Sequence, residues 1–130
     1  MTFCGHHPKM DLGLGEFGEG VATAVQNRQE RDNLSDAEVR SRELTEMSNL
    51  NDALANEGDG SRKKALQGLS MFIGAVFEIA AKRTDTPFHM AIEEEVRAVA
   101  ALIEPMEKEA RRLMQVGGTM ADLAKWVAQQ

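Results

Sequence analysis

A nearly unbroken apolar stretch over residues 65–81 dominates the hydrophobic pattern of this chain, and basic clusters at 62–64 and 82–83 bracket it. Its large apolar side chains recur at spacings of three and four around most of the helical circumference, which predicts an α-helix. A helix that is apolar on nearly every side is normally covered by its neighbours. We therefore expect this segment to be a buried central helix around which the rest of the chain folds.

Two membrane interpretations compete with a buried helix. A membrane span needs about 20 mostly apolar residues, whereas this stretch is shorter and includes Gln67, Ser70 and Glu78. A helix lying on a membrane surface needs a broad polar face, and here polar or neutral positions form only a thin line. We expect no stable membrane insertion. A central helix that is partly exposed to a partner is the remaining alternative.

Shorter hydrophobic stripes predict helices on both sides of the central one. Ser35 and Glu38 match a capping box that opens a helix over residues 36–56. The expected buried stripe of that helix is Leu44, Met47, Leu50 and Leu54. Near the other end of the chain, Thr119 and Asp122 match a second capping box, which predicts a short last helix.

The longest regular pattern follows Thr86 and Pro87, which fit an N-cap and a first-turn proline. Apolar residues then keep an alternating spacing of four and three, which is typical of coiled coils. They are Ile92, Val96, Val99, Ile103, Met106, Ala110 and Leu113. Pro105 removes one backbone hydrogen bond, so it predicts a kink in this helix, with a clean break near Glu104 as the alternative.

Together these elements predict an all-α protein, an up-and-down bundle of four main helices joined by short loops. A further short helix at the N-terminus fits a weak pattern over residues 16–32. Residues 1–20 hold five of the eleven glycines and few large apolar groups, so we expect a flexible tail there. Residues 21–130 should then form a single domain.

The charge distribution supports packing within one molecule. The net charge is −6; residues 36–60 carry two basic and seven acidic groups, whereas residues 61–84 carry five basic groups and one acidic group. An acidic chain without a basic face is a poor ligand for nucleic acid. Cys4 is the only cysteine and no secretory signal is recognisable, so we expect a cytoplasmic protein, with signal-less export as an alternative.

Two N-terminal strings resemble ligand-binding motifs. Residues 13–18 fit the glycine pattern of dinucleotide loops, but such loops follow a strand and none is expected here. Cys4, His6 and His7 could bind a soft metal ion, yet a structural zinc site needs a second ligand pair on a fixed frame. We expect neither a cofactor nor a metal site at this end of the chain.

Three residues further along could belong to a catalytic or metal site. His89 and Glu93 lie one helical turn apart, but the Glu-x-x-His pairs of di-iron bundles are missing. Glu78 is the one acid within the apolar stretch, and Lys82 lies one turn further on, where it can form an ordinary ion pair. We therefore predict no catalytic residue.

Methionine side chains adapt easily to different partners, and exposed aromatic residues favour interfaces. Among the methionines, Met71 falls on the thin polar line and is expected to be the most exposed. The predicted partner-binding residues are Met71, Met114, Met120, Leu123, Trp126 and Val127.

The sequence thus favours a non-enzymatic helical interaction module, such as a subunit, adaptor, chaperone or small regulator. We expect self-association, most simply as a homodimer, or a complex with another protein, through the long helix and the last helix. An exported effector with an N-terminal signal is the first alternative. A metal-binding or enzymatic bundle that uses Glu78, His89 and Glu93 is the second.

Overall fold

The computed structural model describes residues 9–56 and 60–130, and all regular structure in them is helical. The all-α class is therefore confirmed. The helices are α1 (Lys9–Arg31), α2 (Asp36–Asn56), α3 (Ser61–Ala81), α4 (Phe88–Ala98), the short 3-10 helix η2 (Val99–Leu102), α5 (Ile103–Val116) and α6 (Met120–Ala128).

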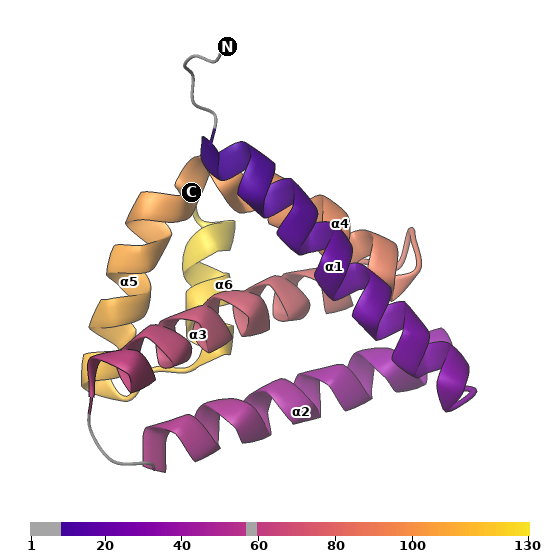
Figure 1. Ribbon diagram of the computed structural model, residues 1–130, viewed down its shortest axis with the longest axis horizontal. Helices are drawn as coiled ribbons and strands as arrows, with labels where there is room; N and C mark the ends of the chain where they lie inside the picture. Colours follow the sequence, from indigo (N-terminus) through magenta and orange to yellow (C-terminus); the bar gives the residue numbers. More distant parts are fainter. Residues whose placement is uncertain (1–8, 57–59) are drawn as a thin grey trace.

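Helix α3 lies at the centre and contacts α2, α4, α5 and α6 (Figure 1). Helices α2 and α3 are antiparallel neighbours, as in an up-and-down bundle. Helix α1 lies along α4, and a sharp bend between α4 and α5 departs from a set of parallel rods. The second half of α3 is buried, including Ala75, Val76 and Phe77. The predicted central role of this segment is thus met, although only half of it is covered.

The predicted long helix is interrupted at Val99–Leu102, before Glu104, where a clean break was the alternative. Helix α4 ends at Ala98, η2 covers four residues, and α5 begins at Ile103. A proline ring collides with the carbonyl group four residues earlier, which for Pro105 belongs to Ala101 within η2. Pro105 itself is the third residue of α5, where a backbone N–H would have no partner within the helix.

The two predicted capping boxes are present. Ser35 Oγ accepts a hydrogen bond from the Glu38 backbone N–H at 3.1 Å, and Glu38 Oε1 accepts one from Ser35 N–H at 2.8 Å. Thr119 and Asp122 make the same reciprocal pair at the start of α6. The hydrogen bond from the backbone of residue 35 or 119 lowers the carboxyl pKa of Glu38 and Asp122.

Arg40 of α2 fixes the C-terminal end of α3. Its guanidinium donates to the carbonyl oxygens of Ala80 at 3.1 Å and Ala81 at 3.0 Å, and also to the carbonyl of Arg83. A further hydrogen bond of 2.7 Å reaches the Thr86 carbonyl. The last carbonyl groups of a helix lack a partner within it. The Ala80 carbonyl also accepts the Arg83 backbone N–H at 3.1 Å, and Arg40 adds a side-chain donor to the end of α3 and to the connection that follows.

Asp36 of α2 provides the cap of α4. Its Oδ1 accepts the backbone N–H of Phe88 at 2.8 Å, and its Oδ2 lies 2.7 Å from Arg40 Nε. The residue at the N-cap position is Pro87, so the prediction that Thr86 caps this helix is wrong. Partial burial opposes ionisation of Asp36, but the hydrogen bonds from Phe88 and Arg40 hold its carboxyl pKa below the ordinary value.

The N-terminal segment differs from the predicted flexible tail. Helix α1 begins at Lys9, so residues 9–20 are helical, while residues 1–8 lie outside the described residues. Gly18 is buried against α4, where an added Cβ would lie 3.2 Å from two carbon atoms of Val96. The missing side chain therefore lets α1 approach α4 closely, a contact that glycine composition alone does not reveal.

A bidentate ion pair holds the other end of α1 on α2. Arg28 Nη2 lies 2.7 Å from Glu43 Oε1, and Arg28 Nε donates to Glu43 Oε2 at 2.9 Å. Glu43 is 4% exposed, and such paired hydrogen bonds to a carboxylate are geometrically specific. This contact explains why the polar second half of α1 is held on the protein.

Candidate functional site

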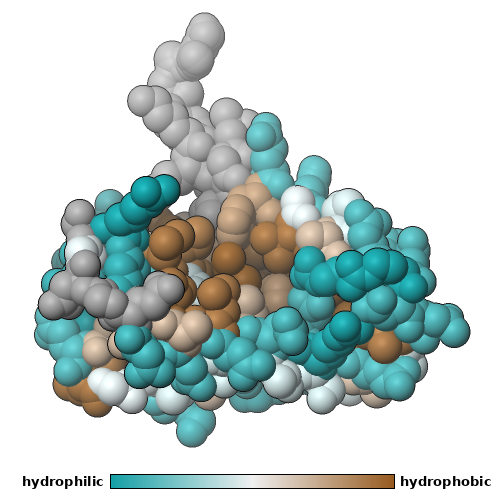
Figure 2. All heavy atoms as spheres, turned by 60° about the horizontal axis from the view of Figure 1, so that its bottom comes forward, coloured by the Kyte–Doolittle hydropathy of each residue, from teal (hydrophilic) through white to brown (hydrophobic). Residues whose placement is uncertain are grey.

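The first half of α3 is largely uncovered. Leu66 and Leu69 are 48% and 46% exposed, whereas Val76 and Phe77 further along the same helix are nearly inaccessible. Figure 2 shows apolar side chains gathered in a hollow on this face, with polar groups around it. The expected burial of the central helix is thus wrong for the side of the first half that carries Leu66 and Leu69, because no described helix covers that side.

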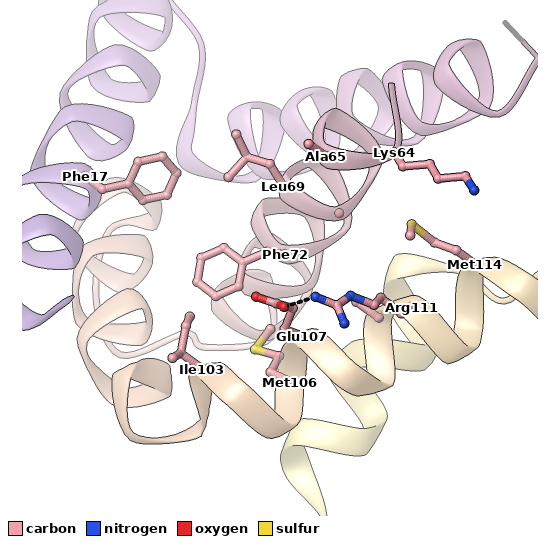
Figure 3. Close-up of a pocket in the computed structure, with 12 residues that line it drawn as sticks. Phe17, Lys64, Ala65, Leu69, Phe72, Ile103, Met106, Glu107, Arg111 and Met114 are labelled. Carbon is pink, nitrogen blue, oxygen red and sulfur yellow. Dashed lines mark hydrogen bonds and ion pairs between the residues drawn. The ribbon is translucent and has the colours of Figure 1, made fainter. Parts of the chain in front are cut away.

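Leu69 lines a groove of about 680 Å³ between α3 and α5 (Figure 3), and Leu66 lies beside it on the same helix. Lys64 and Met114 lie at one end, and Phe72 and Ile103 lie toward the other end, where Phe17 of α1 closes the space. The ring centroids of Phe17 and Phe72 are 6.4 Å apart. The full lining is Phe17, Lys64, Ala65, Gly68, Leu69, Phe72, Ile103, Met106, Glu107, Ala110, Arg111 and Met114.

The groove is apolar apart from three charged side chains. Glu107 and Arg111 form an ion pair with each other one helical turn apart on α5, and both are mostly exposed. Lys64 makes no ion pair within the described part of the chain. Since the remaining lining is aliphatic, aromatic or thioether, this surface is suited to burying apolar groups.

Three of the six predicted partner-binding residues lie inside the protein. Met71, Met120 and Leu123 are each less than a tenth exposed, so a partner cannot reach them, and the expected exposure of Met71 is wrong. The physical reason lies one turn away at Gly74. An added Cβ there would lie 2.3 Å from Met120 Sδ, so the missing side chain forms a socket that lets α6 cover this side of α3.

The other three predicted residues remain accessible in part. Met114 lines the groove. Trp126 and Val127 of α6 are partly buried and pack against the hydrophobic core. The structure thus brings Met114 together with Leu69, Phe72 and Phe17, and not with the other predicted residues.

The sequence analysis did not identify Phe17 as a site residue, and it placed Leu66 and Leu69 within the segment that was expected to be buried. Periodicity identifies the apolar face of a helix but contains no information about whether a neighbour covers it. Phe17 carried a usable signal, because it belongs to the weak apolar pattern predicted for the N-terminal helix. The glycine-rich composition around it favoured a flexible tail instead.

A smaller hollow of about 240 Å³ lies where α2, α3 and the start of α6 meet. Asn51 Nδ2 donates to the Met47 carbonyl at 3.1 Å, and Ser70 Oγ donates to Asn51 Oδ1 at 3.0 Å. Both polar side chains are therefore satisfied by local hydrogen bonds, and this arrangement explains their presence between packed helices.

The residues considered for metal or acid–base chemistry do not converge. Within residues 9–56 and 60–130, no three His, Cys, Asp or Glu side chains are grouped to hold a metal ion. Glu93 pairs with Arg97 at 2.6 Å, and His89 Nδ1 is buried with no hydrogen-bond partner in the described structure.

The predicted ion pair between Glu78 and Lys82 is not formed. Cys4, His6 and His7 lie outside the described residues.

Comparison with protein-family models, curated proteins and solved structures gave no match. By length and composition alone, the described segment Arg62–Ala81 could cross a membrane, with a mean hydropathy of 1.3. The core helix of a soluble protein passes the same test, so this property does not distinguish between the two.

Proposed function

We propose that this chain is a non-enzymatic helical interaction module whose groove between α3 and α5 takes up the apolar face of a helix from a protein. The observation that carries the proposal is the open groove of about 680 Å³, lined almost entirely by apolar side chains. A surface of this kind is a common mark of an interaction site.

The shape of the groove favours a helix as its occupant. Its α5 wall extends from Ile103 to Met114, which corresponds to about 16 Å at 1.5 Å per residue. A bound amphipathic helix presents apolar anchors at positions i, i+3, i+4 and i+7, which cover about 11 Å by the same rise. The flexible and partly exposed Met114 can adjust to the side chains that enter.

The charged side chains of the lining support contact rather than catalysis. Glu107 and Arg111 neutralise each other at the exposed edge of the groove. A catalytic acid or base usually has a polar partner that tunes its pKa within a cleft. The lining supplies Lys64 as the only further titratable group.

The proposal can be tested by NMR with a model amphipathic peptide that has leucine at i, i+3, i+4 and i+7. With ¹³C-methyl-labelled methionine, we expect the Met114 signal to shift during the titration. Met90 is exposed on α4 outside the groove, and its signal should not move. A peptide of the same composition without the apolar stripe is the control ligand.

Leu69→Asp should abolish binding of the peptide, because a carboxylate would have to be buried at the centre of the contact. Leu50→Asp is a matched control, since Leu50 on α2 has the same exposed fraction of 46% and lies outside the groove. Equal loss of binding in both variants, or shifts that do not include Met114, would contradict the proposal.

A further inference from the structure

We infer that the groove is occupied by α3 of a second copy of this chain, packed antiparallel so that two grooves close on each other around a two-fold axis. This inference rests on the proposed function and names its partner. It predicts a homodimer centred on α3, not on the long helix and the last helix as the sequence suggested.

The apolar groups that could fill the groove are on the same helix that forms its wall. In the described part of the chain, the large hydrophobic residues that are strongly exposed are Leu50, Leu66, Leu69, Met90 and Val116. Only Leu66 and Leu69 among them lie together, on one helix beside the groove. The others are single residues on α2, α4 and α5. The first half of α3 is therefore the best apolar complement that this chain offers.

The small residues next to these leucines leave room for a partner. An added Cβ on Gly68 would meet nothing within 4 Å, and Ala65 is exposed one turn before Leu69. Leucine side chains of a second α3 can occupy this space while the two backbones approach closely. Because α3 supplies both the protruding leucines and the space for them, the contact is self-complementary, as a two-fold interface requires.

Charge decides the direction of the two helices. A parallel pair would bring the two basic clusters at residues 62–64 side by side, and like charges at short distance repel. An antiparallel pair separates the clusters and moves each one toward the end of the partner's groove that Phe17 closes. Gly68 then lies near the two-fold axis, where close backbone approach matters most.

Acidic groups flank that closed end. Glu16 precedes Phe17 on α1, and Glu104 follows Ile103 on α5; both are exposed. Neither forms an ion pair within the described part of the chain. The basic cluster of one copy therefore meets acidic residues of the other in the antiparallel arrangement. Two copies of a chain with a net charge of −6 repel each other overall. The local charge complementarity opposes this repulsion only in the antiparallel arrangement, and it therefore favours that docking geometry.

The direct test is the molar mass of the full chain in solution, measured by sedimentation equilibrium from about 1 μM to about 100 μM, where small interfaces dissociate. We expect the mass to approach twice the 14.3 kDa of one chain as the concentration rises. Leu69→Asp should remain monomeric throughout, and Leu50→Asp should dimerise like the unaltered chain. Circular dichroism must show that both variants keep their helix content.

Charge reversal tests the direction of packing. Lys64→Glu and Glu104→Lys should each weaken dimerisation about fivefold, because each removes the two symmetry-related exposed ion pairs of the dimer. Combining the two substitutions should restore the original affinity. If the combined variant does not regain the dimerisation affinity of the unaltered chain, the antiparallel arrangement is wrong.

Other outcomes separate this inference from the proposed function. If the chain is monomeric at every concentration and still binds the model peptide, the homodimer is wrong and the interaction module stands. A dimer that survives Leu69→Asp lies elsewhere on the surface and also overturns the inference. If the monomer instead binds only vesicles of phosphatidylcholine and phosphatidylglycerol, through Leu66 and Leu69, both proposals fail.

Discussion

Both halves of α3 carry large apolar side chains, but these side chains differ in their surroundings. The segment from Ala75 to Phe77 is enclosed by neighbouring helices, whereas Leu66 and Leu69 remain nearly half exposed. The ends of the helix differ in the same way. Arg40 satisfies the carbonyl groups at the C-terminal end, while Gly60 provides no side-chain cap at the N-terminal end. One half of the helix thus builds the core, and the other half is left available for contact.

The largest difference between the halves should appear on truncation of a side chain. Phe77 is 2% exposed and packs edge-on against Phe88, with ring centroids 5.6 Å apart. Phe77→Ala should lower the free energy of unfolding by about 3–5 kcal/mol, because it leaves a cavity. Leu69→Ala should cost less than about 1 kcal/mol in the monomer. Urea titration at low protein concentration measures the free energy of unfolding of both variants. An equal decrease in the two variants would contradict the proposed difference between the buried and the exposed half of α3.

The end of α3 that Arg40 holds should be the next most sensitive point. Arg40→Met leaves several backbone carbonyl groups and Asp36 without their partner, which should cost about 3 kcal/mol. The guanidinium also lies 5.5 Å from the centroid of the Phe88 ring. Arg40→Lys should recover little of the loss, because an ammonium group cannot reach as many acceptors. Thermal unfolding followed by circular dichroism measures the stability of both variants. If Arg40→Lys were as stable as the unaltered protein, the several donors of the planar guanidinium group would not be what holds this end of α3.

Two glycines of α3 should respond with opposite signs. Gly74→Ala would place a methyl group 3.0 Å from Met120 Cβ, and such overpacking typically costs about 1–3 kcal/mol. Gly68→Ala meets open space and should stabilise the monomer by up to about 1 kcal/mol through helix propensity. Chemical denaturation of both variants under the same conditions is the measurement. A destabilising Gly68→Ala would show that this half of α3 is covered after all.

The smallest expected effect is on the stability of the protein at low pH. Because the pKa of Asp36 is lower in the folded protein than its ordinary value, its contribution to stability is present above the unfolded pKa of about 3.9. That contribution is lost as the pH falls through the lower folded pKa. Asp36→Asn should therefore lower stability at pH 7 and flatten the loss between about pH 5 and pH 2. An unchanged slope of stability against pH would argue against the cap that Asp36 provides to α4.

Much of the fold follows from local sequence signals. The capping boxes at Ser35 and Thr119 and the central apolar segment all depend on contacts within a few residues, and each was predictable. Pro105 likewise predicted an interruption of the helix, because its ring would collide with the carbonyl group of Ala101 in any regular α-helix. The choice between a kink and a break was open, since packing of α4 and α5 on other helices decides it.

The candidate site was far less predictable. Met71 was predicted to be exposed because it falls on the thin polar line of the helix, yet Gly74 one turn away leaves room for Met120 of α6 to cover this side. Likewise, Phe17 is placed in the groove because Gly18 lets α1 approach Val96. In both cases a glycine that weakens a helix locally permits a close contact with a distant segment, and no local pattern encodes that contact.

The sequence by itself determined where the helices form and which of their faces are apolar, because both properties arise from spacing and capping along one segment. Only the tertiary structure decided which apolar faces are covered. That outcome depends on the bend after Ala98 and on the caps that Asp36 and Arg40 supply across the molecule, over separations of about forty to fifty residues. Coverage is a property of the whole arrangement of helices, so the same apolar segment becomes core at one end and exposed surface at the other.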